Sequence, residues 1–318
     1  MSKKTRYSLG ILLTILIGTY FYWELCCGDD ISSNANKIKE NVVQRNANND
    51  SYSSTSTPKI TGYPFVLRDP DGDFALRSDD NFNFDSSGYN ILRPVSEKVN
   101  SGIDELQLYL SANERKLVNI SGMYTSAEEN TSAFPNLGMA RANSVKNYLI
   151  TKGIPSSQMN LLGKLNENLK PDGMVFRGPV HFGISNAVAT SEENNETELE
   201  VLQKRIQEDP LILNFANAQT RIDLTEAQRL KIAEIVRYLD LSKDGKALVT
   251  GHTDATGSST SNVTIGQKRA NFAKNYLVQN GILEARIEAT SKGSAEPVGN
   301  NATQEGRAQN RRTVVTVN

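Results

Sequence analysis

The sequence predicts an α+β protein in which two tandem copies of a two-layer βαβαβ sandwich follow a single transmembrane helix. Three observations lead to this prediction: an apolar segment near the start, a group of residues that recurs later at a constant offset, and alternating strand and helix patterns in the second half. A length of 318 residues is enough for about two domains with additional segments.

The N-terminal segment has the pattern of a membrane anchor. Lys3, Lys4 and Arg6 precede residues 7–23, which contain no Asp, Glu, Lys, Arg or His and are rich in Leu, Ile and aromatic side chains. Such a segment rises about 25 Å as a helix, which is near the lower limit for crossing a bilayer. We therefore expect residues 1–27 to anchor the protein as a helix, which favours the inner membrane. Basic residues favour the cytoplasmic side, so we expect the domains that follow to lie in the periplasm.

Two other interpretations of this segment remain open. A cleaved signal peptide requires small residues at the cleavage site, and a lipoprotein signal requires them just before a cysteine. Glu24 and Leu25 precede Cys26 and Cys27 and meet neither requirement well. The sequence therefore favours an anchor that is retained.

Two polar segments separate the parts of the chain. Residues 28–60 are mainly Asn, Ser, Thr, Asp and Lys, which bury too little apolar surface to offset the entropy of ordering. Residues 186–199 are acidic and polar. We expect both segments to be linkers.

The two blocks between and after these linkers resemble each other. Arg141-Ala142-Asn143 recurs as Arg269-Ala270-Asn271, and Lys146-Asn147-Tyr148-Leu149 recurs as Lys274-Asn275-Tyr276-Leu277. The offset is 128 in both cases. We infer a duplication, with a first copy over residues 61–185 and a second over residues 200–318.

The second copy alternates strand and helix patterns. The expected strands are residues 211–215, 247–250 and 313–317, which are short, apolar or β-branched. The expected helices are residues 225–239, with apolar residues at a helical period, and a segment that begins at a capping box in Thr264–Gln267 and ends before Gly281. This order predicts helices on one face of a small sheet.

Several motifs of the second copy resemble the OmpA-like family, named after the C-terminal domain of outer membrane protein A. They are Thr250-Gly251-His252-Thr253-Asp254-Ala255-Thr256-Gly257, then Asn262, Arg269-Ala270 and Gly306-Arg307-Ala308-Gln309-Asn310-Arg311-Arg312, with Lys292-Gly293 in the connecting loop. The resemblance covers about 110 residues. It implies the OmpA-C-like fold and non-covalent binding of peptidoglycan through the diaminopimelate of the stem peptide.

The resemblance assigns this ligand to Asp254 and Arg269, and the chemistry of the ligand agrees. The free end of diaminopimelate carries an ammonium and a carboxylate on one carbon, so it calls for one anion and one planar cation a few ångströms apart. We expect Arg269 in the first two turns of its helix, where free amides also favour a carboxylate. Thr253, Asn262 and Arg312 complete the expected ligand-binding set, although Asn262 and Arg312 could instead brace the site.

The first copy departs from this pattern at the acid. Thr125 stands at the position of Asp254, whereas Arg141 matches Arg269. Glu128 and Glu129 lie in a loop that is one residue longer and could substitute for the missing acid. We interpret this copy as degenerate, with a structural role or an envelope protein partner.

Composition narrows the function further. A net charge of −1 gives no reason to expect nucleic acid, and two adjacent cysteines provide neither a disulfide framework nor a thiolate metal site, so no cofactor is expected. Only His181 and His252 are present and no hydrolase motif appears, which disfavours an enzyme. A flagellar stator subunit is disfavoured too, because its membrane helix carries an acidic residue and residues 7–23 contain none.

The sequence thus predicts a membrane-anchored protein of the cell envelope that tethers the membrane to the cell wall. The alternative is an envelope hydrolase, or a lipoprotein-type scaffold, that uses the OmpA-like domain only for targeting.

Overall fold

A computed structural model describes residues 62–187, 192–214 and 223–318. The predicted anchor (residues 1–27) and the predicted linker over residues 28–60 lie outside these ranges. Within them, no helix is both long enough and apolar enough to span a bilayer. We call residues 62–187 the N-module and residues 192–318 the C-module.

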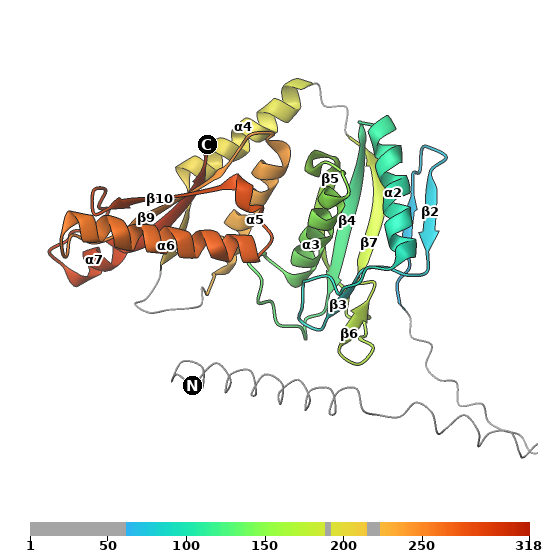
Figure 1. Ribbon diagram of the computed structural model, residues 1–318, viewed down its shortest axis with the longest axis horizontal. Coiled ribbons are helices and arrows are strands. Elements are labelled where there is room, and N and C mark those ends of the chain that lie inside the picture. Colours follow the sequence, from blue (N-terminus) through green and yellow to red (C-terminus); the bar gives the residue numbers. More distant parts are fainter. Residues whose placement is uncertain (1–61, 188–191, 215–222) are drawn as a thin grey trace, which may run out of the picture. The chain divides into compact units, whose positions relative to one another are not determined.

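The N-module is built on a three-stranded sheet in the order β5-β4-β7 (Figure 1). The central strand β4 pairs in parallel with β5 and antiparallel with β7. Two short strand pairs, β1-β2 and β3-β6, complete the module. Its elements are β1 Phe65–Arg68, β2 Ala75–Ser78, β3 Asn83–Asp85, α2 Glu97–Ala112, β4 Lys116–Tyr124, α3 Leu137–Thr151, β5 Met159–Leu165, β6 Val175–Arg177 and β7 Val180–Asn186.

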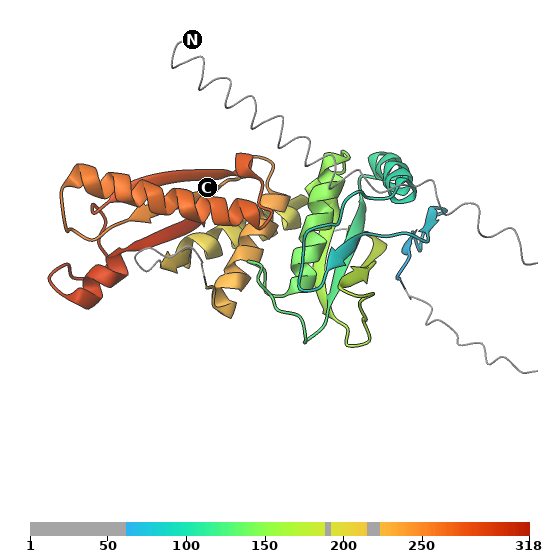
Figure 2. The same cartoon turned by 60° about the horizontal axis from the view of Figure 1, so that its bottom comes forward.

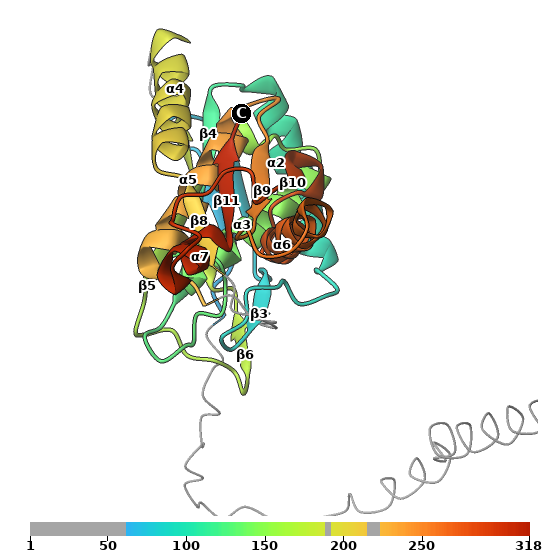
Figure 3. The same cartoon turned by 90° about the vertical axis from the view of Figure 1, so that its left-hand side faces the viewer.

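The C-module is built on a four-stranded sheet in the order β10-β9-β11-β8. Strand β9 pairs in parallel with β10, and β11 lies between β9 and β8 and is antiparallel to both (Figure 3). Helix α6 runs along this sheet (Figure 2). Its elements are α4 Glu192–Glu208, β8 Leu211–Asn214, α5 Glu226–Leu241, β9 Ala247–His252, α6 Ser259–Gln279, β10 Ile287–Gly293, α7 Gln304–Asn310 and β11 Arg312–Val317.

The helix at residues 225–239 forms as predicted, but the helix before Gly281 begins earlier than expected. Thr225 caps α5 in a capping box with Gln228. Helix α6 is capped by Ser258, whose hydroxyl accepts from the Ser261 amide. The predicted capping box at Thr264 is wrong, because the Thr264 hydroxyl donates to the Thr260 carbonyl inside the helix. Arg269 therefore lies ten residues into the helix and outside its first two turns.

Strand β10 and the helices α4 and α7 of the C-module were not predicted from the sequence. Lys292 and Gly293 end strand β10, where a connecting loop was expected. Strand β10 is an edge strand, and its inward positions Ala289 and Ser291 are small, so it lacks the apolar run of a buried strand. Helix α7 is seven residues long, too short for a clear helical period.

The expected linker over residues 186–199 is only partly a linker. Asn186 still belongs to β7, and helix α4 begins at Glu192. Leu202 and Ile206 of α4 are buried in the core of the C-module, so the apolar second half of this helix is part of the fold. The boundary proposed at residue 200 thus falls inside a helix.

Strand and helix approach closely at a pair of glycines in each module. A Cβ atom on Gly251 of β9 would lie 1.9 Å from the Gly266 carbonyl oxygen of α6, and one on Gly122 of β4 would lie 2.0 Å from that of Gly138 in α3. No other residue allows backbones to pack at this distance. The contact sets the height of each helix above its sheet, and Arg269 follows Gly266 by three residues.

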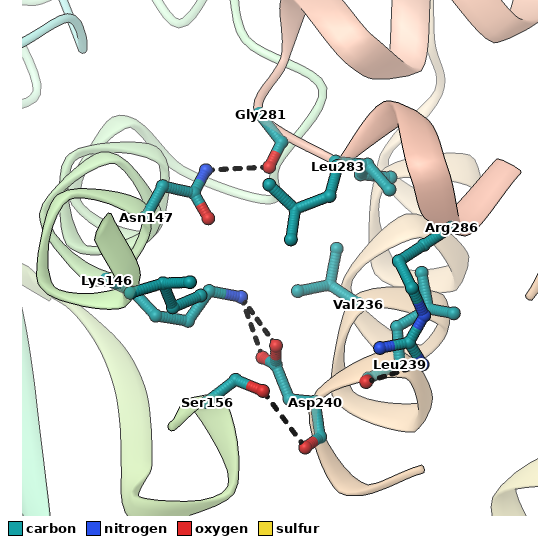
Figure 4. Close-up of a pocket in the computed structure, with 11 residues that line it drawn as sticks. Lys146, Asn147, Ser156, Val236, Leu239, Asp240, Gly281, Leu283 and Arg286 are labelled. Carbon is teal, nitrogen blue, oxygen red and sulfur yellow. Dashed lines mark hydrogen bonds and ion pairs between the residues drawn. The ribbon is translucent and has the colours of Figure 1, made fainter. Parts of the chain in front are cut away.

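The two modules pack against each other within one compact unit, Pro58–Asn318. Ala133 and Phe134 of the N-module belong to the same buried cluster as the core of the C-module. Lys146 of α3 donates to both carboxylate oxygens of Asp240 at 2.8 Å, and Asn147 donates to the Gly281 carbonyl at 2.7 Å (Figure 4). A cavity of about 30 Å³ lies beside these contacts. We call this set of contacts the module seam.

Candidate functional site

The candidate site lies in the loop between β9 and α6. The backbone of this loop is fixed at Thr253, whose amide donates to the Gly293 carbonyl at 2.8 Å. Two residues later, the Ala255 amide donates to Asn301 Oδ1 at 3.0 Å. The loop is therefore held by the end of β10 and by the segment before α7, with Asp254 between the two attachments.

Asp254 makes a local turn and an ion pair at the same time. Its Oδ1 accepts from the Thr256 amide at 2.9 Å, and its Oδ2 accepts from Arg311 Nη1 at 2.8 Å. The side chain is 13% exposed. Burial would raise the pKa of Asp254, but the hydrogen bonds from Arg311 and Thr256 outweigh it and hold that pKa below its usual range. Asp254 is thus an anion at neutral pH.

Arg269 lies close to this pair without bonding to Asp254. Its Nη1 donates to the His252 carbonyl at 2.9 Å, and the guanidinium is half-buried. Burial lowers the pKa of Arg269 first, nearby Arg311 lowers it further, and Asp254 opposes both effects. Arg269 thus bonds the backbone two residues before Asp254, and Arg311 bonds the Asp254 carboxylate itself, so the three side chains form one charged cluster at the end of β9. Arg311 is the direct ion-pair partner of Asp254. That Asp254 and Arg269 together bind a ligand stays a prediction.

Thr253 and His252, which were expected at or near the ligand, are buried. Both residues are at most 5% exposed, and the Thr253 hydroxyl and His252 Nδ1 have no hydrogen-bond partner among the residues that the structure describes. Burial lowers the pKa of His252, and Arg312 lowers it further. Both side chains are therefore enclosed by the protein at the end of β9.

Asn262 and Arg312 are buried and bond the segment that follows β10. Asn262 is buried in α6, and its side-chain amide donates to Ser294 Oγ at 3.4 Å. Arg312 is buried at the start of β11, and its Nη2 donates to the Glu296 carbonyl at 3.2 Å. Both side chains hold the loop that follows β10.

Two residues that act at the site were missed in the sequence. Arg311 pairs with Asp254, and Asn301 holds the Ala255 amide while accepting from Asn310 Nδ2 at 3.0 Å. Arg311 belongs to the closing motif quoted above, but a run of two arginines does not reveal which one points to the site. The alternation of side chains in a strand could have distinguished them. Arg312 is the first residue of β11 and faces inward, so Arg311, just before it, faces the other way.

The corresponding position in the N-module is closed. Arg141 is fully buried, and its guanidinium donates to both oxygens of Glu128 and to the carbonyls of Gly88, Met123 and Asp85. Glu128 also accepts from the amides of Ser87 and Thr125, each at 3.0 Å. Glu128 therefore supplies the carboxylate that Thr125 does not, and it forms an ion pair with Arg141 in the interior of the protein.

The chemistry of the site follows from its charges. One carboxylate and two guanidiniums, all near the surface, can bind a group that carries both an ammonium and a carboxylate. Among the described residues, no three side chains of His, Cys, Asp or Glu are placed to hold a metal ion.

Comparison with known proteins identifies relatives that match parts of this chain. The family model described as "OmpA family" matches residues 83–172 and 214–311, one segment in each module. The peptidoglycan-binding protein ArfA of Mycobacterium tuberculosis is 40% identical over 75 residues, which are 24% of this chain and 23% of ArfA. The peptidoglycan-associated lipoprotein of Buchnera aphidicola is 31% identical over 125 residues, which are 39% of this chain and 68% of the lipoprotein.

A solved structure is also similar. The peptidoglycan-associated lipoprotein from Burkholderia pseudomallei is 27% identical, with a TM-score of 0.29, and the match covers 34% of this chain and 89% of the lipoprotein. The family model spans more than half of the described chain across its two segments. This chain therefore belongs to the OmpA family.

Proposed function

We propose that this protein binds peptidoglycan non-covalently, without catalysis, through the diaminopimelate of the stem peptide. Asp254 takes the ligand ammonium, and Arg269 takes the carboxylate on the same carbon. Relatives named as peptidoglycan-binding and peptidoglycan-associated proteins support the ligand class. The charged cluster at the end of β9 supports the site.

The contrast between Arg269 and Arg141 carries this proposal. Arg141 bonds five oxygens of the protein, whereas the Arg269 side chain, among the described residues, makes one hydrogen bond, to the His252 carbonyl. A guanidinium has five N–H donors, so Arg269 keeps donors for a ligand and Arg141 does not. The C-module is thus the binding module, and the N-module serves as a structural partner.

The test is calorimetry of the full-length protein with a stem tripeptide that ends in meso-diaminopimelate. Asp254→Asn keeps an oxygen that accepts from the Thr256 amide but loses the negative charge. Arg269→Gln loses the positive charge and the paired N–H donors of the guanidinium. Each charge-assisted bond is worth about 1.5–3 kcal/mol, so either change should weaken binding about tenfold or more. The double variant should lose less than the sum, because a ligand freed from one clamp is not held in register for the other.

Two controls separate binding from folding. Asp244→Asn makes the same change at an exposed aspartate outside the site and should bind like the wild type. Thermal melts should stay close to that of the wild type, because the ion pair of Asp254 is partly exposed. Wild-type affinity in both site variants, or loss of binding only through unfolding, would reject the site.

We also propose that residues 1–27 anchor the protein in the inner membrane and that its modules, the products of a duplication, lie in the periplasm. The charge-free segment over residues 7–23 supports the anchor. Protein from native membranes should keep its full mass and resist extraction by alkaline carbonate. A mature chain that starts at Cys26 or Cys27 would replace the anchor with a lipid attachment.

A further inference from the structure

The role of Arg311 extends the proposed function, on which the following inference rests. Arg311 Nη1 donates to Asp254 Oδ2 at 2.8 Å, and this is the carboxylate that the ligand ammonium needs. Arg311 is the C-cap residue of α7, and Arg312 starts β11, so its backbone is fixed on both sides. Only its side chain can leave when an ammonium arrives.

The two guanidiniums favour an anion between them. Asp254 supplies one negative charge, whereas Arg269 and Arg311 supply two positive charges. Arg269 donates to the His252 carbonyl at 2.9 Å, and Arg311 donates to Asp254, two residues further along the same loop, at 2.8 Å, so both guanidiniums lie at the end of β9. An ammonium that displaces Arg311 from Asp254 leaves both guanidiniums without that anion, and a carboxylate shared between them removes their repulsion.

We propose that Arg311 is a specificity residue that moves from Asp254 to the ligand carboxylate, so that the site prefers a wall peptide with a free carboxylate over its amide. An amide keeps the shape and an acceptor oxygen but has no charge to bridge two guanidiniums. Amidation of this carboxylate is thus the chemical change that the site is built to detect.

The mutation that isolates this role is Arg311→Gln in the full-length protein. The probes are the stem tripeptide with free diaminopimelate and the same peptide amidated at the carboxyl group beside the free ammonium. Arg311→Gln removes one bridge to the carboxylate and also frees Asp254 for the ammonium. The ratio of the two dissociation constants, amide over acid, should therefore fall about fivefold or more relative to the wild type.

Two further variants define the result. Lys268→Gln removes an equal charge from an exposed position next to Arg269 and should leave the ratio unchanged. Arg311→Lys keeps the charge without the fork, so its ratio should lie between those of the wild type and Arg311→Gln. It also serves as the second probe if Arg311→Gln melts early.

The outcomes separate this inference from the proposed function. If the wild type binds neither peptide, the proposed function fails. If the wild type prefers the acid and Arg311→Gln keeps the full preference, the site stands and the role of Arg311 is refuted. Equal weakening of both peptides would likewise refute it, because it would mean that Arg311 only supports the fold of the loop.

Discussion

The same arginine has opposite uses in the two modules. Arg269 lies at the surface with donors to spare, whereas Arg141 is enclosed and pairs with Glu128, whose side chain is 3% exposed. An ion pair that is buried and bonded on every side has no donor or acceptor left for a ligand. The difference arises from the acid: Asp254 follows the strand directly, whereas Glu128 reaches back from the longer loop.

The N-module should therefore not bind the wall peptide. This is best tested in the full-length protein, because the modules share a buried core and an isolated N-module would expose Phe134. The double variant Asp254→Asn/Arg269→Gln disables the C-module and should show no saturable binding of the stem tripeptide by calorimetry. Residual binding of wild-type strength would place a working site in the N-module.

The site residues that belong to one sequence motif could be predicted from the sequence. Asp254 and Arg269 were predicted as one ligand-binding pair; the structure has Arg269 bonded to the backbone two residues before Asp254, and their role in binding stays a prediction. Arg311 was missed because its partner is 57 residues away, and nothing local to the closing motif specifies that contact. The role of Glu128 was left open, since a loop of unknown path does not show whether its acid turns inward.

At the scale of single elements, the glycine pairs control where the site arginine stands. Gly251 and Gly266 let α6 sit directly on β9, and Arg269 lies one turn beyond Gly266. A change in this contact would move the helix and the guanidinium together. The stability of the strand-helix contact and the geometry of the site are thus coupled.

Gly251→Ala should destabilise the protein and weaken ligand binding together. Its Cβ would meet the Gly266 carbonyl at 1.9 Å, and overpacking of this kind costs about 1–3 kcal/mol. The measurements are chemical denaturation and calorimetry with the stem tripeptide. Gly183→Ala in β7 is the matched control, because no atom lies within 4 Å of the added Cβ, and it should leave binding unchanged. Normal binding by Gly251→Ala would show that the contact does not position Arg269.

Helices and strands whose sequence carries a clear apolar pattern or capping box were predicted. Those without such a pattern were not. The strands at 211–214, 247–252 and 312–317 lie where apolar or β-branched runs predicted them, and α5 begins at its capping box. Strand β10 was missed because an edge strand with small inward residues lacks such a run. Helix α6 starts before Thr264 because Ser258 competes as the cap, and local propensity alone did not distinguish the two.

For the molecule as a whole, the module seam decides whether the two modules act as one body. Lys146 and Asp240 form an ion pair whose side chains are 4% and 12% exposed. Burial raises the pKa of Asp240, and Lys146, Arg237 and Arg286 lower it. Asp240 is the counter-charge that acts on Lys146, whereas Asp240 is acted on by three basic side chains, so removing either partner should not have the same effect on stability.

Asp240→Leu should therefore destabilise the protein more than Lys146→Met. Removing one partner of a buried pair costs about 3–5 kcal/mol, and Asp240→Leu leaves Lys146 with no counter-charge. Lys146→Met should cost less, because Arg237 and Arg286 still face Asp240. The measurement is the free energy of unfolding in guanidinium chloride.

Two comparisons make the test of the seam decisive. The double variant Lys146→Met/Asp240→Leu should be more stable than Asp240→Leu alone, since no charge is then left unpaired. Lys204→Met breaks an exposed pair with Glu208 and should change the free energy of unfolding by less than about 0.5 kcal/mol. Equal losses in both single variants would contradict the inferred asymmetry.

The closed pair in the N-module also bears on the history of the molecule. Restoring an acid by Thr125→Asp would put a second carboxylate beside Glu128, with Arg141 already committed. Removing Glu128 first would leave Arg141 charged and fully enclosed. Each single step toward an Asp254-like site in the N-module should thus cost stability, so on the proposed duplication the closed state of Arg141 and Glu128 would be difficult to reverse.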